Sequence, residues 1–136
     1  MNNSKVKFFL VFDESGDIPK EIHVIPTGEW DHPSYGQIKI TEDDVAEFVK
    51  NFNAGLRNDI PINEGHEVMD EKPAIGWFKK LVNKGSDGLW AVVEWTEQGK
   101  DLLRQKAYKY FSPEFYQQYE DPETRRVYNN VLVGGH

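Results

Sequence analysis

Apolar and polar positions alternate along much of this chain, in short runs separated by turn-forming residues. A period of two in such runs is typical of β-strands, whose side chains point alternately to opposite faces. The expected strands cover residues 6–12, 20–25, 37–40, 60–66, 74–82, 89–95 and 126–133. Residues 30–36 and 116–124 are polar and rich in turn formers, so we expect loops there.

Two segments follow a helical spacing instead. Thr41 is a good N-cap, and the three acidic residues after it suit the positive end of a helix dipole. The apolar stripe that follows consists of Val45, Phe48, Val49 and Phe52. Gly55 is a suitable stop for this helix. Thr96 is expected to cap a second helix over residues 97–107, with Leu102, Leu103 and Ala107 facing inward.

Many strands, two helices and no strand–helix–strand rhythm predict an α+β fold. The expected sheet or barrel is mainly antiparallel, with six to seven strands. The length of 136 residues suits one domain with a real core. Because the chain stops at Gly134-Gly135-His136 directly after an expected strand, we expect it to be the N-terminal part of a longer protein, truncated after His136.

Composition narrows the function classes. The formal charge of −7 disfavours a nucleic-acid-binding surface, and the short basic pairs at 79–80 and 125–126 are interpreted as solvated charges. The absence of cysteine excludes disulfides, thiol catalysis and thiolate zinc sites. The apolar run 6–12 is too short to span a bilayer and lacks a signal-peptide cleavage site, so neither a membrane nor secretion is expected. The expected location is the cytoplasm.

Four histidines are candidates for catalytic or metal-binding groups: His23, His32, His66 and His136. His23 and His32 have no motif around them and are interpreted as surface residues. His66 ends an apolar strand after a glycine, a position from which scaffolds often present catalytic groups. Asp70 stands where a zincin motif needs its second histidine. His66 with Glu64, Glu67 and Asp70 could bind a divalent cation, but flexible acidic loops are common, so we expect neither a metal nor another cofactor here.

Ser112 lies among aromatic residues in the stretch 108–115 and is followed by proline. Proline biases the preceding residue towards extended backbone, so Ser112 is expected on a strand or at its end. A buried serine needs a hydrogen-bond partner, and a histidine in that role would form a nucleophile and base. The alternative is a structural serine bonded to backbone.

Trp90 and Trp95 lie five residues apart in one expected strand and therefore face opposite sides of the sheet. One of the two is expected in the core and the other partly exposed or at an interface.

Several sequence blocks occur in the order of a known family. They are residues 25–30 (IPTGEW), 48–53 (FVKNFN), the strand leading to His66, 74–77 (AIGW), 88–96 (GLWAVVEWT), 108–115 (YKYFSPEF) and 132–136 (LVGGH). Together they resemble the Mu-like prophage protease, the I protein of transposable and related phages. The resemblance implies a capsid-maturation serine endopeptidase that cleaves scaffold and major capsid proteins, inside the assembling prohead, in the cytoplasm of the bacterial host.

The same resemblance implies a fold related to the herpesvirus assemblin protease, and a Ser-His-His site. Carried onto this chain, Ser112 is the nucleophile, His66 the general base and His136 the third member. Because assemblin-type proteases dimerise, an exposed aromatic patch would fit a homodimer. Family members often carry acidic residues just before the histidine, whereas Asn63 and Gly65 occupy such positions here. Glu64 and Glu67 are acidic and could orient His66 instead, so either is an alternative third member.

Two hypotheses for the function of the chain follow. In the first it is a serine peptidase, although the loss of an oxyanion-hole donor beyond His136 would leave this fragment inactive. In the second it is a non-catalytic scaffold or assembly domain that keeps the protease fold.

Overall fold

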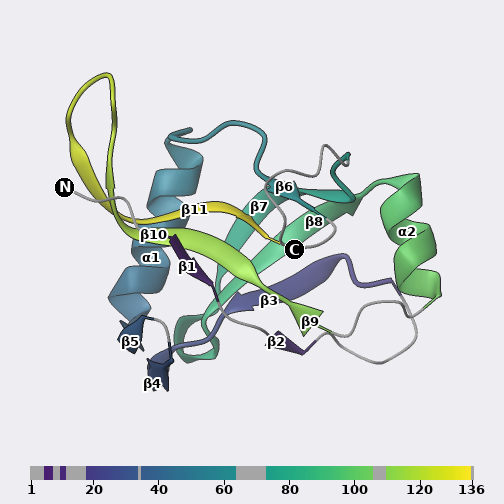
Figure 1. Cartoon of the computed structure of the whole chain (residues 1–136), viewed down its shortest axis with the longest axis horizontal. Helices are drawn as coiled ribbons and strands as arrows, with labels where there is room; N and C mark the ends of the chain where they lie inside the picture. Colours follow the sequence, from purple (N-terminus) through teal and green to yellow (C-terminus); the bar gives the residue numbers. More distant parts are fainter. Residues whose placement is uncertain are drawn as a thin grey trace.

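The computed structural model describes residues 5–7, 10–11, 18–33, 35–63, 73–105 and 110–135. Its main feature is a seven-stranded sheet in the order β1-β10-β11-β6-β7-β8-β3 (Figure 1). In that order the strands are Lys5–Lys7, Pro113–Glu120, Val127–Gly135, Pro61–Ile62, Gly76–Asn83, Leu89–Trp95 and Glu21–Ile25. Two small sheets pair β2 (Leu10–Val11) with β9 (Tyr110–Phe111), and β4 (Gly28–His32) with β5 (Gly36–Ile40).

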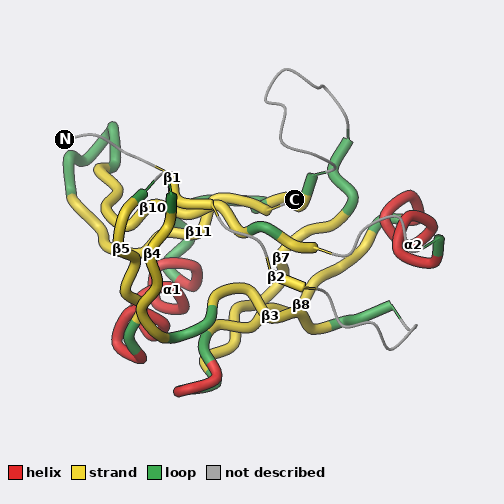
Figure 2. The backbone as a smooth tube through the Cα atoms, turned by 60° about the horizontal axis from the view of Figure 1, so that its bottom comes forward, coloured by secondary structure: helices red, strands yellow, loops and turns green. Residues whose placement is uncertain are grey.

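The fold is α+β, as predicted from the sequence. Among the described strand pairs all are antiparallel except β11 with β6, which is parallel. The helices are α1 (Glu42–Asn53) and α2 (Glu97–Arg104), and a short 3-10 turn, η1 (Gly85–Asp87), lies in the connection between β7 and β8. Figures 1 and 2 both show the two helices at opposite ends of the molecule. Neither is long and apolar enough to cross a membrane.

Helix α1 begins as its sequence predicts. The Thr41 hydroxyl accepts a hydrogen bond from the Asp44 amide at 3.1 Å, and the Asp44 carboxylate accepts one from the Thr41 amide at 2.8 Å. This reciprocal capping box satisfies two donors that a helix start leaves unpaired. Val45 and Phe48 are fully buried, and the helix packs on β11 and β7.

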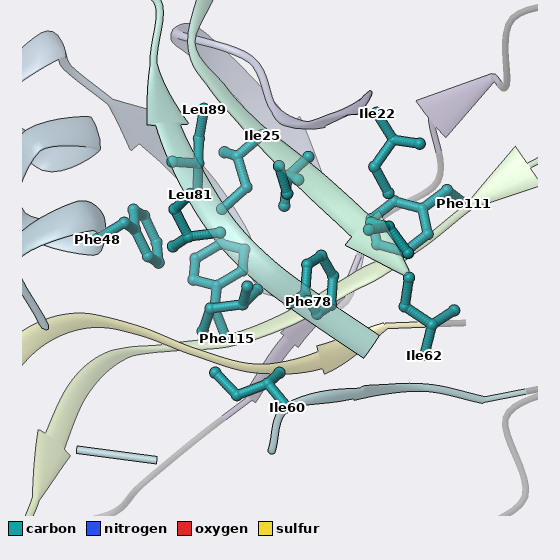
Figure 3. Close-up of a cluster of buried hydrophobic side chains, with 14 of the residues drawn as sticks. Ile22, Ile25, Phe48, Ile60, Ile62, Phe78, Leu81, Leu89, Phe111 and Phe115 are labelled. Atoms are coloured by element: carbon teal, nitrogen blue, oxygen red, sulfur yellow. The ribbon is translucent and has the colours of Figure 1, made fainter. Parts of the chain in front are cut away.

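The core lies between the main sheet, α1 and Phe111 of β9, and it is built from aliphatic and aromatic side chains (Figure 3). Phe48 meets Phe115 edge-on, with ring centroids 5.3 Å apart. Phe78 and Phe111 form a second edge-on pair at 6.1 Å. Such geometry stabilises aromatic pairs beyond the area they bury. The core therefore packs the segment around Phe111 firmly against β7.

Several predicted boundaries were wrong. The expected strand 6–12 is two strands, β1 and β2, which pair in different sheets. Residues 28–32, expected partly as loop, form β4 of a hairpin with β5. Strand β10 continues to Glu120, through a segment expected to be a polar loop. Helix α2 ends at Arg104 rather than near residue 107, and Ala107 lies outside the described residues.

The three errors in the strands have one cause. These segments pair with partners that are polar or distant in sequence, and local hydrophobic alternation carries no signal for such pairing. Of the expected strand 60–66, Pro61–Ile62 forms β6, Asn63 lies just past it, and residues 64–66 lie outside the described residues.

Candidate functional site

Ser112 lies between β9 and β10, where the chain passes from the small sheet with β2 into the seven-stranded sheet. The residue is fully buried, at 0% exposure. Its Oγ atom has no hydrogen-bond partner in the part of the chain that the structure describes. A buried hydroxyl without a partner costs about 1–3 kcal/mol, so its retention requires an explanation other than stability.

Three chain segments meet beside Ser112. Pro113, the first residue of β10, is paired with Gly135 at the end of β11. Gly135 is in turn paired with Ile62 at the end of β6, and its carbonyl accepts a hydrogen bond from the Asn63 amide at 2.8 Å. Because β6 and β11 are parallel, the chain leaves both strands at the same end of the sheet, and β10 begins at that end (Figure 1).

Phe111 fixes this junction from the core side. The side chain is 1% exposed, and its ring lies against the backbone of Gly135 as well as against Phe78. The residue just before Ser112 thus contacts the last described residue of β11, and the two backbones are held together by packing as well as by the ladder.

Asn51 and Asn130 were not singled out from the sequence, yet they hold β11 in place. The Asn51 amide donates to the carbonyls of Asn129 at 2.7 Å and Asn130 at 3.2 Å. Asn130 has a left-handed backbone, with φ 65°, and donates from its side chain to Asp44 at 2.9 Å. The available signal was an Asn-Asn pair that interrupts an otherwise apolar strand, since asparagine tolerates this conformation.

Ser112 is the only predicted catalytic residue within the described part of the chain. His66, His136, Glu64 and Glu67 lie outside the described residues, and their assigned roles stay predictions. The structure does describe the positions that these residues follow, because Asn63 precedes the segment with His66 and Gly135 precedes His136. Asn63, Gly135 and Ser112, from which the three predicted site segments can be traced, therefore lie at one end of the sheet.

Residues 22–134 match the family model described as Mu-like prophage I protein, N-terminal domain. The chain belongs to this family. The match includes Ser112 and His66 and ends two residues before His136, so nearly all of the described fold is the N-terminal domain of a Mu-like prophage I protein. No curated protein and no solved structure shows significant similarity to the chain.

His23 of this I-protein domain lies on the strand face opposite Ile22 and Val24, as its strand pattern predicted, but it is only partly exposed there. Its ring stacks on Trp90, with centroids 4.8 Å apart and planes 6° apart, and its Nε2 atom is buried without a hydrogen-bond partner among the described residues. Burial lowers the pKa of His23 below its ordinary value, although backbone groups of Ile25 and Asp87 oppose the shift. Nothing in this arrangement supplies a proton acceptor to Ser112.

The two tryptophans of β8 confirm the predicted division between faces. Trp95 is buried, and its Nε1 donates to the Pro19 carbonyl at 2.6 Å. Trp90 is half-buried on the opposite face, where the Lys84 ammonium lies 4.1 Å from its ring centroid. His32, the last residue of β4, packs against Tyr35 at 4.6 Å and lies in a separate hairpin from Ser112.

Proposed function

We propose that this Mu-like prophage I protein domain is the catalytic part of a serine endopeptidase, with Ser112 as nucleophile, His66 as general base and His136 as third member. Its substrates in this proposal are phage scaffold and major capsid proteins, cleaved inside the assembling prohead in the bacterial cytoplasm. The alternative third members are Glu64 and Glu67.

The observation that carries the proposal is the meeting of Ser112 with the ends of β6 and β11. His136 is covalently attached to Gly135, whose strand partner is Pro113, next to Ser112. His66 follows Asn63 by three residues, and an extended chain of that length spans at most about 11 Å. Both histidines are therefore linked, directly or through a short segment, to residues that lie at the same end of the sheet as Ser112.

The unpaired Ser112 hydroxyl adds support from energetics. A structural serine at full burial would be expected to bond to a backbone group. In this chain the hydroxyl instead keeps its hydrogen-bonding capacity unused by any described residue, which suits a group that reacts. Its complete burial also means that the site has to open before a peptide bond can reach Oγ.

The chemistry follows from these residue types. Serine is a weak nucleophile until a base accepts its proton during attack, and imidazole has a suitable pKa for that task. A third group must hold the imidazole in one tautomer and stabilise the imidazolium. A neutral histidine stabilises that cation less than a carboxylate would, so a Ser-His-His site is expected to turn over slowly.

The decisive test uses the full natural chain, expressed with the scaffold and capsid proteins of its prophage. Ser112→Ala is expected to lower scaffold cleavage by more than about a thousandfold, whereas the exposed Ser86→Ala control leaves it unchanged. Unchanged cleavage by Ser112→Ala would reject the nucleophile. Parallel variants His136→Ala, Glu64→Gln and Glu67→Gln then identify the third member by which of them slows cleavage.

The complete burial of Ser112 favours one alternative, a non-catalytic assembly domain that retains the fold. In that case Ser112→Ala would leave both scaffold processing and particle assembly unchanged, while substitutions that disrupt the sheet would abolish assembly.

A further inference from the structure

A cleft of about 450 Å³ lies where the segment before β3, together with β7 and β8, approaches α2, and Ser112 is not among its described lining residues. Four basic side chains from three separate parts of the chain line it: Lys20, Lys79, Lys100 and Arg104. Its lining also includes apolar groups, among them Val92 and Trp95. Cations around an apolar surface are suited to a ligand that is both acidic and hydrophobic.

The charge of this cleft is opposite to that of the molecule. Among the described residues that line the cleft, four of the chain's 16 basic residues stand beside one of its 23 acidic residues, Glu94, while Glu97 and Asp101 pair with Lys100 and Arg104 at the edge. The rest of the chain therefore carries 12 basic against 22 acidic residues. An acidic partner would be repelled by most of the surface and attracted here, so charge directs binding to one place.

Three of the four cations already form ion pairs on the surface, and these pairs are weak enough for a bound ligand to replace. Lys79 lies 3.9 Å from Glu94, Lys100 lies 3.3 Å from Glu97, and Arg104 lies 3.1 Å from Asp101. The acidic partners are 63–83% exposed, and exposed pairs of this kind contribute little to stability. A carboxylate of a bound partner can replace them at small cost.

The walls of the cleft are fixed rather than loose. The Thr96 hydroxyl and amide both donate to the Ile75 carbonyl at 3.0 Å, and Gly99 lies so close to the same carbonyl that no side chain would fit. These contacts set the position of α2 beside the sheet (Figure 1). On the other side, the Val93 amide donates to the Lys20 carbonyl at 2.9 Å. A preformed site loses less entropy on binding.

We infer that this cleft is a docking site for an acidic segment of a partner protein that carries an apolar side chain between its carboxylates. The aliphatic lining of Ile18, Val92 and Val93 favours a peptide with an apolar side chain over a nucleic acid, because bases stack best on exposed aromatic rings and Trp95 is buried. The inference does not depend on the role of Ser112.

The test is fluorescence anisotropy with a labelled peptide in which several glutamates flank a central leucine. Lys79→Glu/Arg104→Glu is expected to weaken binding by about tenfold or more, the effect of losing charge-assisted contacts. Lys39→Glu/Arg126→Glu makes the same change in net charge outside the cleft, and should weaken binding by less than about twofold. Replacing the leucine by serine should also weaken binding.

Equal weakening by both double variants would overturn the inference, because it would show attraction to the molecule as a whole. Absence of peptide binding would also overturn it. So would a labelled single-stranded oligonucleotide that binds the cleft more tightly than the peptide. Circular dichroism checks that the variants fold. If Lys79→Glu/Arg104→Glu does not fold, the neutral Lys79→Gln/Arg104→Gln variant takes its place.

Discussion

The ring of Phe111 occupies the space in which a side chain on Gly135 would begin. A Cβ built at Gly135 would lie 2.5 Å from two of the ring carbons, closer than real Cβ atoms approach other heavy atoms. Gly134, one residue earlier, meets nothing closer than the Pro61 carbonyl oxygen at 3.5 Å. Close packing therefore excludes a side chain at Gly135 but not at Gly134, and a substitution at Gly134 is a control for the same substitution at Gly135.

Gly135→Ala is expected to destabilise the domain by about 1–3 kcal/mol, because overpacking at this point has to displace Phe111 or the end of β11. Gly134→Ala should change the free energy of unfolding by less than about 1 kcal/mol. Urea unfolding measures both. Phe111→Leu in the Gly135→Ala background should recover part of the loss, and strictly additive effects would refute the contact as the cause.

Ser112→Ala is expected to keep or raise stability, by up to about 1–2 kcal/mol, since it removes a buried hydroxyl that has no described partner. Under the proposed function the same substitution abolishes cleavage. Stability measured by urea unfolding and cleavage measured on scaffold protein should thus move in opposite directions, as they do where a residue is retained for function. A loss of more than about 1 kcal/mol would show that the hydroxyl is structural after all.

Gly99→Ala is expected to destabilise the domain strongly, by about 2 kcal/mol or more, although alanine is a better helix former than glycine. A Cβ there would lie within 2.0 Å of the Ile75 carbonyl oxygen, which belongs to the backbone and cannot rotate away. The exposed neighbour substitution Gln98→Ala should be neutral or slightly stabilising. Thermal unfolding of both variants distinguishes close packing from helix propensity.

His23 should make the domain less stable as the medium becomes acidic. Its folded pKa is lowered, so between the unfolded value of 6.5 and the lower folded value the unfolded chain binds a proton that the native chain does not. The free energy of unfolding therefore does not depend on His23 titration above pH 6.5, and it decreases as the pH falls through that window. Lys84 and Asp87 both influence this ring, with opposite signs.

The measurement is the melting temperature of the wild type and of His23→Gln between mildly alkaline and mildly acidic pH. The difference between the two proteins isolates His23 from the carboxylates. It should change below pH 6.5 and stay constant above it. A difference that does not vary with pH would mean that the stacked ring titrates normally.

The sequence predicted those elements whose causes are local. Helix α1 was correctly placed because its cap and apolar stripe lie within a dozen residues, and the β7–β8 hairpin was recognised from its glycine-containing connection. Strand β4 was missed because Trp30-Asp31-His32 before proline has the composition of a loop, and its pairing depends on β5. The end of β10 was missed because Tyr116 and Tyr119 stand on a mostly exposed hairpin.

The site could be anticipated only in part for the same reason. Ser112 stood out through its aromatic neighbours and the proline after it, and family resemblance supplied its assigned partners. Asn63 and Gly135 are hydrogen-bonded although they lie 72 residues apart in the sequence. Hydrophobic periodicity reports only local structure, so it could not predict this contact. The basic cleft was missed because Lys20, Lys79 and Arg104 lie in separate segments, and the Lys79-Lys80 pair was interpreted as ordinary solvated charge.

The place of β11 in the sheet has a consequence for how the protein is made. This strand lies between β10 and β6, so without it the sheet divides into a β1–β10 part and a β6–β7–β8–β3 part with no ladder between them. Residues 127–135 also come after all the other described strands in the sequence, so they leave the ribosome after them. The two parts therefore join, and the ends of β6 and β10 meet, only after all the other described strands have been translated, which postpones assembly of the proposed site to a late step of folding.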